Sequence, residues 1–490
     1  MSVAGILNKF KNIKHPHKPY LVGGVVRDIL LQRNTKDIDL VCKNARSLAK
    51  KFAKSTGSSF FVLDEENKIY RVVIKLRTTN DEPPTIYDYD FAEMRGGSIA
   101  ADLALRDFTI DAMALEIVAS SRLQVASKSI IDPFGGQKDL KNKIIRMVGK
   151  DIYKDDPLRM MRAFRLAAVL GFKIENNTLA LISHQARLIK KVSLERVREE
   201  LIKILSCPGS TAYIRAMDQH ELLAVLIPEI KKLKTAARNF YGSDGVWRHT
   251  LSGMEYLETI ILKINKYIPR YALKINQHMN TLVIADVPRW VILKMAYLLH
   301  DFGKPDTETK EGKRSRFFGH ELASALYADK ILTRLHFSNK EIHTIKNIIM
   351  NHMRPGNLSA LGKISDKAIY RYFRDLKEEG LDTLVLSIAD AYTTEETVIS
   401  RKKQDIYPVD ARQHLNRVRA IIKRYYTQHR QIVPKNLLNG HEIMSRFKIT
   451  EGPLIGKMIN SLKEAQAQKL VTTKAQAYEY CNKLLTSDEK

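Results

Sequence analysis

The sequence is poor in cysteine and has no long uncharged apolar run. Its three cysteines, Cys42, Cys207 and Cys481, lie too far apart to suggest a zinc knuckle or a redox pair, and three cannot all pair within one chain. No apolar stretch approaches the roughly 18 residues that a membrane span needs. The first twenty residues are interrupted by lysines and do not form a secretory signal. We therefore expect reduced cysteines, no membrane span and a cytoplasmic location.

Acidic residues are in deficit relative to basic ones. The chain has 81 Lys and Arg against 54 Asp and Glu, which gives a net charge of +27. Such a surplus attracts polyanions through counterion release and electrostatic steering, so nucleic acid is the first partner to consider. Charge alone identifies no fold or site, and a generally basic proteome or a solubility adaptation is the alternative explanation.

The length and the hydrophobic pattern predict a modular α+β chain. Its 490 residues exceed the roughly 250–300 at which single hydrophobic cores stop growing. Short β-branched runs fill residues 19–118, whereas apolar residues recur three and four apart from Pro157 onward. The stretch 265–290 is less periodic and predicts a long loop. We expect a β-containing N-terminal module followed by helices, without internal repeats.

Two aspartates near the N-terminus have the spacing of a metal site. Asp37 and Asp39 are separated by one residue in an apolar run, so on a strand both carboxylates point to the same face. Two like charges on one face repel each other, and the pair makes most sense around divalent cations. Mg²⁺ takes few protein carboxylates and leaves positions for triphosphate oxygens and water. The pattern predicts phosphoryl or nucleotidyl transfer.

A glycine pair and an arginine precede these aspartates. Gly23 and Gly24 supply a turn without side chains, where the backbone can approach phosphates, and Arg27 follows one helical turn later and can offset their charge. Taken separately, the glycines would be an ordinary turn and the aspartates a solvated strand end. Their order and spacing together favour a nucleotide site.

The run LVGGVVRDILLQRNTKDIDLV, residues 21–41, closely resembles the signature of the class II tRNA nucleotidyltransferase and bacterial poly(A) polymerase family. The resemblance implies a nucleotidyltransferase head with a mixed β-sheet. In such a head the glycine pair contacts the triphosphate, and the two strand aspartates bind metal, here Mg²⁺, and are catalytic.

A second stretch, DLALRDFTIDAMAL at 102–115, resembles the family's RRDFTINAMA motif. The resemblance implies that Arg106 and Asp107 hold the sugar and phosphates of the incoming nucleotide. Leu105 stands where the family has its first arginine, and Asp111 where it has asparagine. The next stretch, DPFGGQKDL at 132–140, resembles the hinge between head and neck.

A third stretch, YKDDPLRMMRAFRLAAVLGF at 153–172, resembles the motif that replaces a nucleic-acid template with side chains. Asp156 and Arg159 lie three apart, and on a helix they share a face where a carboxylate and a guanidinium can meet a base edge. The resemblance implies that this pair distinguishes C and A from G and U. The two acidic residues 155 and 156 also suit a helix N-terminus. Arg162 extends a cationic stripe that we expect to meet triphosphate or tRNA.

The second half of the chain carries a set of histidines and aspartates. A single histidine on an apolar helix is usually a satisfied core residue, but the adjacent pair in LLHDFGKP is more informative. This region resembles an HD-type phosphohydrolase domain. The resemblance implies a divalent transition metal or Mg²⁺ and hydrolysis of a phosphomonoester or cyclic phosphodiester; a purely structural role is the alternative. The implied core ligands are His249, His300, Asp301 and Asp390, with His320 and His352 as candidates for a second metal.

These resemblances divide the chain into four parts. We expect a head at 1–148, an all-helical neck with the nucleotide-selecting helix at 149–235, an HD-type domain at 236–404 and a helical tRNA-binding tail at 405–490.

The implied activity is template-independent addition of CCA to tRNA 3′ ends, or to other RNA 3′ ends, from CTP and ATP with release of pyrophosphate. The alternatives are a relative that adds only CC, only A or poly(A), and an HD-type RNA-end phosphohydrolase as the main activity. A non-enzymatic basic RNA-binding protein would explain the charge but neither set of metal ligands. The oligomeric state stays open.

Overall fold

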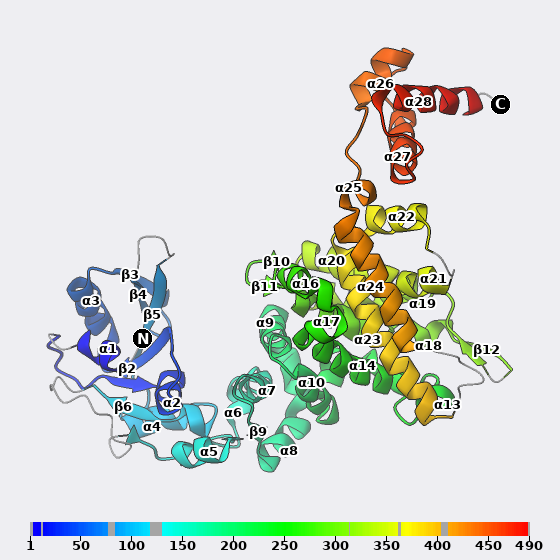
Figure 1. Ribbon diagram of the computed structural model, residues 1–490. Coiled ribbons are helices and arrows are strands. Elements are labelled where there is room, and N and C mark those ends of the chain that lie inside the picture. The colour runs from blue at the N-terminus through cyan, green and yellow to red at the C-terminus, as the bar shows by residue number, and fades with distance from the viewer. Residues whose placement is uncertain are drawn as a thin grey trace. The chain divides into compact units, whose positions relative to one another are not determined.

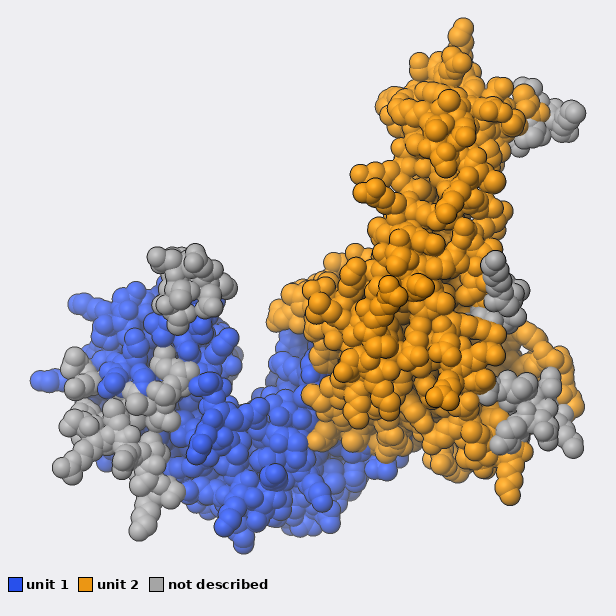
Figure 2. Space-filling model, in the orientation of Figure 1, with its two compact units in different colours: residues 1–207, 216–226 blue, residues 208–215, 227–490 orange. Residues whose placement is uncertain are grey.

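The computed structural model, shown in Figure 1, describes residues 3–10, 13–76, 84–117, 130–312, 314–360, 364–402 and 410–488. They form two compact units, coloured separately in Figure 2: residues 1–207 with 216–226, and residues 208–215 with 227–490. The division falls inside the expected neck, and the four-part division of the chain stays a prediction. Within the described ranges, no helix is long and apolar enough to cross a membrane.

The first unit is built on a mixed sheet of seven strands in the order β3-β4-β5-β2-β1-β6-β7. Strands β2 and β5 run parallel, and all the other neighbouring pairs are antiparallel. The predicted α+β fold with a mixed N-terminal sheet is confirmed. The strands are β1 (Tyr20–Val22), β2 (Asp37–Cys42), β3 (Ser59–Asp64), β4 (Ile69–Leu76), β5 (Thr85–Glu93), β6 (Ala114–Glu116) and β7 (Ile130–Ile131).

Alternation along β2 separates the two faces of this sheet. Ile38 and Leu40 point into a core closed by α1 (Val3–Asn8) and α3 (Ala45–Thr56), where Phe52 is fully buried. Asp37 and Asp39 therefore point to the opposite face. Around β1 and β6 that face packs against α4 (Ile99–Ala104) and the short 3-10 helix η1 (Thr109–Asp111).

Helices follow the sheet in the first unit. Helix α7 ends at Gly171, which takes a left-handed conformation with φ of 68°, and its apolar face packs on α9. The elements are α2 (Gly24–Leu30), α5 (Gly136–Asn142), α6 (Ile152–Asp155), α7 (Arg159–Leu170), α8 (Asn176–Gln185), α9 (Leu194–Leu205) and α11 (Leu222–Leu226). Helix α10 (Ser210–Gln219) is divided between the units, and its residues up to Arg215 belong to the second. A two-stranded ribbon of β8 (Ile144–Ile145) and β9 (Lys173–Ile174) interrupts the helices expected there.

The second unit is helical, with α14, α17, α20 and α23 packed on one another. Its helices are α12 (Ile230–Thr235), α13 (Arg238–Tyr241), α14 (Gly245–Leu262), α17 (Arg289–Leu299), α18 (Lys304–Thr307), α19 (His320–Arg334), α20 (Asn339–Asn351), α21 (Arg354–Ala360), α22 (Asp366–Leu376), α23 (Glu379–Ser400), α24 (Ala411–Thr427), α25 (His429–Ile432), α26 (Gly440–Phe447), α27 (Pro453–Ala467) and α28 (Lys474–Asp488). A small hairpin joins β12 (Thr309–Glu311) to β13 (Arg314–Arg316).

The long loop predicted over 265–290 is wrong. This stretch contains α15 (Ile264–Tyr267), η4 (Pro269–Tyr271), α16 (Ala272–Met279) and a ribbon of β10 (Leu282–Ile284) with β11 (Val287–Pro288). Ile275 and Met279 are four residues apart in α16 and both are buried. Elements this short contain too few turns for the helical period to stand out in the sequence.

A buried ion pair inside the second unit holds the first residues of α10, which belong to that unit. Lys294 on α17 lies 2.8 Å from Glu258 on α14, and the side chains are 2% and 7% exposed. The same carboxylate accepts hydrogen bonds from the hydroxyls of Ser210, at 2.5 Å, and Thr211, at 3.0 Å. One buried charge thus organises three helices.

We predict that Lys294→Met destabilises the second unit by about 3 kcal/mol, because it leaves the Glu258 carboxylate buried without its cation. The melting temperature of the full chain, followed by scanning calorimetry, should fall clearly. Lys263→Met, at the exposed end of α14, is the control and should melt as the wild type does. Equal melting temperatures of the two variants would contradict the predicted contribution of the Lys294–Glu258 ion pair to stability.

Candidate active sites

Four carboxylates lie on one face of the head sheet. Parallel pairing of β2 with β5 sets Asp37 opposite Asp88 and Asp39 opposite Asp90. Asp37 and Asp39 share a face as the sequence spacing implied. Sequence reasoning missed Asp88 and Asp90, although their own one-residue spacing in TIYDYDF was a usable signal.

Electrostatic repulsion in this row is only partly neutralised. Both oxygens of Asp90 accept hydrogen bonds of 2.7 Å from Arg71 on β4, which also lies 3.4 Å from Asp88. Burial, together with the neighbouring Asp90 and Asp37, raises the pKa of Asp39 to about 6, against the attraction of Arg106. A cation at Asp37 and Asp39 would relieve this repulsion, and carboxylate oxygens are the ligands that Mg²⁺ prefers. The donor set therefore fits a divalent cation.

Gly23 brings the main chain against this row. Its φ is 72°, and a Cβ at this position would lie 2.6 Å from Nη1 of Arg106 and 3.7 Å from Oδ2 of Asp39. Only glycine meets both the conformation and the space. Gly24 follows as the first residue of α2.

Arg27 on α2 is already held by carboxylates. It donates to Asp28 at 2.9 Å and to Asp111 at 2.7 Å. Asp111, the residue that departs from the family motif, is thus the partner of the arginine expected to face the triphosphate. Burial raises the pKa of Asp111, while the charge of Arg27 opposes that rise.

The motif around Arg106 contacts the helix that follows the head. Arg106 has Nε 3.6 Å from the buried Asp102. Asp107 accepts a 2.7 Å hydrogen bond from Nε of Arg162 on α7. Burial opposes ionisation of Asp107, but the charges of Arg162 and Arg159 more than compensate and lower its pKa. Arg162, expected to meet triphosphate or tRNA, is an ion-pair partner in this structure.

Asp156 and Arg159 lie at one turn but not on one helix, so the prediction of a shared helix is wrong. Asp156 is extended, with φ of −144°, between α6 and α7, and Arg159 is the first residue of α7. Proline at 157 disfavours a helical conformation in the residue before it.

Both side chains are nevertheless held in place. The Asp156 carboxylate accepts from the Leu158 amide and from Arg196 on α9, each at 3.1 Å. Arg159 donates to the main-chain carbonyl of Leu105 at 2.9 Å. That contact does not depend on which side chain stands at position 105.

The second site collects the histidines and aspartates from separate helices of the second unit. The structure brings together all six of the residues that the sequence singled out. Nε2 of His249 lies 3.0 Å from Asp390 and 3.7 Å from Asp301. The six residues are His249 (α14), His300 and Asp301 (after α17), His320 (α19), His352 (after α20) and Asp390 (α23).

Three imidazoles point lone pairs at Asp301. Nδ1 of His300, His320 and His352 lies 2.6–2.7 Å from a main-chain carbonyl in each case, so Nδ1 donates and Nε2 of the neutral ring carries a lone pair. Nε2 of His320 and His352 are 3.1 Å apart. Burial, followed by the charges of neighbouring histidines, lowers the pKa of His352 to about 3.

The arrangement fits a divalent metal. Nε2 of His300 and Oδ1 of Asp301 are buried and have no hydrogen-bond partner within the described ranges. The ligand atoms of His249, His300 and Asp301, and those of Asp301, His320 and His352, lie within 4.8 Å of one another. Lys304, which belongs to the LLHDFGKP motif but was given no role from the sequence, donates to Asp301 at 2.6 Å and to Tyr241 at 2.9 Å.

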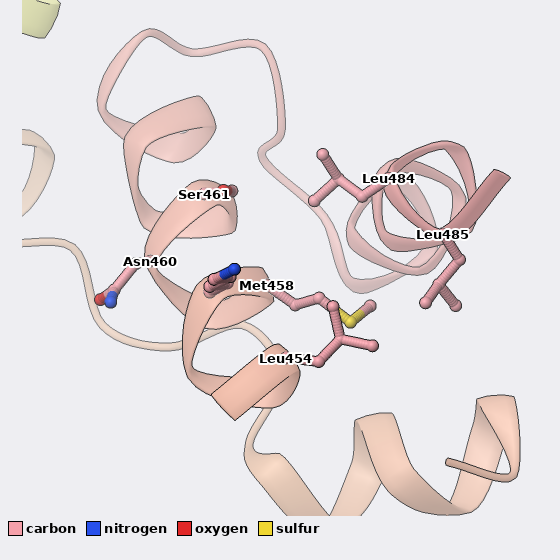
Figure 3. A pocket seen from close by; sticks show the side chains of 7 residues that line it. Leu454, Met458, Asn460, Ser461, Leu484 and Leu485 are labelled. Carbon is pink, nitrogen blue, oxygen red and sulfur yellow. The ribbon is translucent and has the colours of Figure 1, made fainter. Parts of the chain in front are cut away.

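A pocket in the tail carries none of these residues. It measures about 390 Å³, and Figure 3 shows Leu454 and Met458 of α27 facing Leu484 and Leu485 of α28. Lys457, Asn460 and Ser461 complete the lining. This lining is typical of a gap between loosely packed helices and not of a catalytic site.

We predict that Asp39→Asn stabilises the metal-free protein at pH 8. Asp39 has a folded-state pKa of about 6 against a usual 3.8. Its protonated form therefore favours the folded state below about pH 4, and this contribution is lost as the pH rises through 6. The Asp39→Asn variant should have a free energy of unfolding about 1–2 kcal/mol above that of the wild type at pH 8, and the difference should be small at pH 4.

Thermal melting in EDTA at the two pH values measures this difference. Addition of Mg²⁺ should then stabilise the wild type and leave the Asp39→Asn variant unchanged. Asp64→Asn is the control, because this carboxylate is outside the row and its hydrogen bonds to Asn67 lower its pKa. A wild type more stable than the Asp39→Asn variant at pH 8 without metal would refute the prediction.

We predict that His352→Asn weakens metal binding by the second unit at least about 10-fold, because the loss of a ligand costs no less than the loss of a ligand's own partner. Titration with Mn²⁺ and with Zn²⁺, followed by calorimetry and by the metal-induced shift in melting temperature, measures the effect. His343→Asn, on the exposed side of the same helix α20, should bind as the wild type does. Metal binding unaffected by His352→Asn would remove this residue from the site.

Comparison with known proteins finds relatives for both halves of the chain. Three family profiles match: Poly A polymerase head domain at residues 19–146, Probable RNA and SrmB-binding site of polymerase A at 171–234, and HD domain at 246–395. The CC-adding tRNA nucleotidyltransferase of Geobacter sulfurreducens is 29% identical over 96% of this chain and 93% of its own. The A-adding tRNA nucleotidyltransferase of Deinococcus radiodurans is 29% identical over 93% of each chain.

In fold, the chain resembles a Thermotoga maritima CCA-adding enzyme complexed with tRNA, with a TM-score of 0.61 and 20% identity over 98% of this chain and 94% of that one. The chain therefore belongs to the class II tRNA nucleotidyltransferase and poly(A) polymerase family, in the form that carries an HD-type domain after the head and the RNA-binding region.

Proposed function

We propose that this protein completes the CCA end of tRNA from CTP and ATP without a nucleic-acid template and releases pyrophosphate. The observation that carries the proposal is the position of Asp37 and Asp39, side by side on an open sheet face against the Gly23 main chain and Arg106. Gly23 lets the triphosphate approach the backbone, and Arg106 offsets its charge.

Asp37 and Asp39 would hold Mg²⁺ at the head. The cation, when bound, activates the RNA 3′ hydroxyl and stabilises the pyrophosphate leaving group. Alternation along β2 puts the two aspartates on the same face, where both could contact it. Asp107 would meet the sugar, and Arg162 keeps that carboxylate ionised and in place.

Asp156 and Arg159 would read the base. The hydrogen bonds from Arg196 to Asp156 and from Arg159 to the Leu105 carbonyl leave a carboxylate and a guanidinium preorganised at one turn. Donors and acceptors fixed in this way suit the Watson–Crick edges of C and A. The base is selected by side chains, so no template strand is needed.

The product is the finer part of the proposal. Three relatives that align over nearly the whole chain are two CC-adding enzymes and one A-adding enzyme. Other relatives, matched over about half of the chain, are CCA-adding enzymes. Single-specificity addition is thus the main alternative to complete CCA addition, with poly(A) synthesis as a further one. Work on tRNA fits a cytoplasmic location and the net charge of +27.

We also propose a metal-dependent phosphohydrolase activity for the second unit. The specific observation is the set of imidazole lone pairs around Asp301. Nitrogen-rich ligation suits a transition metal such as Mn²⁺ or Zn²⁺ better than Mg²⁺. A bound metal would supply a hydroxide for attack on phosphate. Lys304, paired with Asp301, fixes that carboxylate toward the site.

The test is incorporation of labelled CTP and ATP, separately and together, into tRNA transcripts that end before CCA, after CC, or after CCA. We predict CCA completion on the shortest substrate. Asp37→Ala and Asp39→Ala should each lower the rate at least about 100-fold, as the loss of one preorganised electrostatic contact to a transition state does. His352→Asn, which alters only the second site, should leave incorporation intact.

Addition of only C, only A or a long A tail would select the corresponding relative. If the wild type added no nucleotide but released phosphate from RNA ends, the nucleotidyltransferase proposal would fail. Phosphate release that survives His352→Asn but not Asp37→Ala would overturn the assignment of hydrolysis to the second unit.

A further inference from the structure

The head sheet presents an apolar and cationic surface beside its carboxylates. Phe61 on β3 is 50% exposed and Ile86 on β5 is 48% exposed. Strand β3 is the edge of the sheet.

Register places this surface on the same face as the carboxylates. Phe61 pairs with Arg71, Arg71 with Asp90, and Asp90 with Asp39, so four side chains form one row across β3, β4, β5 and β2. Direct cross-strand neighbours project from the same side of a sheet. Phe61 therefore stands three strand spacings, about 14 Å, from Asp39.

Cations are interleaved with the apolar side chains. Arg71 lies between Phe61 and Asp90 in the row, and the exposed Lys75 pairs with Ile86 on the same face. An aromatic ring beside arginine and lysine is how proteins hold single-stranded nucleic acid, because the ring stacks on a base and the cations follow the phosphates. An apolar protein partner or the interior of a lipid bilayer would not require cations between the apolar side chains.

We infer that the surface formed by Phe61, Arg71, Lys75 and Ile86 binds the single-stranded 3′ end of the RNA acceptor, with Phe61 stacking on a base close behind the terminal nucleotide. The inference rests on the proposed function, because the terminal 3′ hydroxyl must reach Asp37 and Asp39. The surface continues from these carboxylates toward the sheet edge, on the side away from the packing of α4 and η1. The incoming nucleotide, held at Gly23 and Arg106, leaves this side free.

The neighbouring residue supplies a matched control. Val62 is 43% exposed, next in sequence on the same strand, and paired with Tyr70 on the opposite face. Phe61→Ala and Val62→Ala each remove an exposed apolar group from one edge strand, an aromatic ring in the first case and two methyl groups in the second. Only the first removes a side chain from the carboxylate face.

The experiment is steady-state incorporation by the full chain, with the KM for tRNA lacking CCA and the KM for CTP measured separately. Phe61→Ala should raise the KM for tRNA about 5-fold or more while the KM for CTP stays constant, since loss of one base–aromatic stack has that effect on affinity. Phe61→Tyr should restore the wild-type value, and Val62→Ala should not differ from it. Equal effects of Phe61→Ala and Val62→Ala, or an unchanged KM for tRNA, would overturn the inference.

Two further measurements separate other outcomes. Fluorescence anisotropy with labelled tRNA lacking CCA tests Phe61→Ala even if the wild type incorporates no nucleotide, so failure of the proposed function and failure of this inference are distinguishable. Sedimentation of the wild type and of Phe61→Ala tests a second copy of the chain as the occupant. A wild-type dimer that Phe61→Ala converts to monomer, with tRNA affinity unchanged, would assign the surface to self-association and overturn the RNA assignment.

Discussion

Repulsion between carboxylates on the parallel strands β2 and β5 is the constraint around which the head is organised. Four aspartates in two in-register pairs would not persist on a sheet face without compensation. Arg71 neutralises one end of the row, Arg106 approaches the other through the space left by Gly23, and a divalent cation completes the balance. The glycine turn, the arginine after α4 and the cation requirement are thus consequences of one electrostatic problem.

The second unit solves a similar problem with different chemistry. Asp301 is fully buried and Asp390 is partly buried, and imidazoles and the Lys304 ammonium, rather than guanidinium groups, lie around them. Main-chain carbonyls accept hydrogen bonds from the three Nδ1 atoms, so Nε2 of each ring is the nitrogen left to bind a metal. Under the proposed function, the oxygen-rich row of the head would suit a hard cation, and the nitrogen-rich cluster of the second unit would suit a softer one.

The local sequence was sufficient to predict the direction of side chains where a short motif lies on a regular strand. The i, i+2 spacing of Asp37 and Asp39 predicted their common face because alternation on a strand is fixed. The six residues of the second site followed from the family resemblance, since their helices are far apart in sequence. Asp88 and Asp90 were missed because their one-residue spacing, although visible in the sequence, does not show which strand they pair with, and parallel pairing with β2 is a long-range choice. The shared helix expected for Asp156 and Arg159 failed at Pro157, whose effect on the preceding residue outweighed the helical spacing. Arg71 gains its role only from side chains that folding brings to it, whereas Lys304 stands three residues from its partner Asp301 in the sequence.

Asp111 gives one substitution within a motif a physical meaning. Where the family has a neutral amide, this chain has a carboxylate that grips Arg27 at 2.7 Å, beneath the turn that faces the triphosphate. That carboxylate acts as a built-in phosphate mimic: it occupies the guanidinium before any nucleotide arrives and fixes its direction. A nucleotide must then share Arg27 with the Asp111 carboxylate. The arginine therefore supports the glycine turn in a fixed orientation rather than moving to bind the ligand.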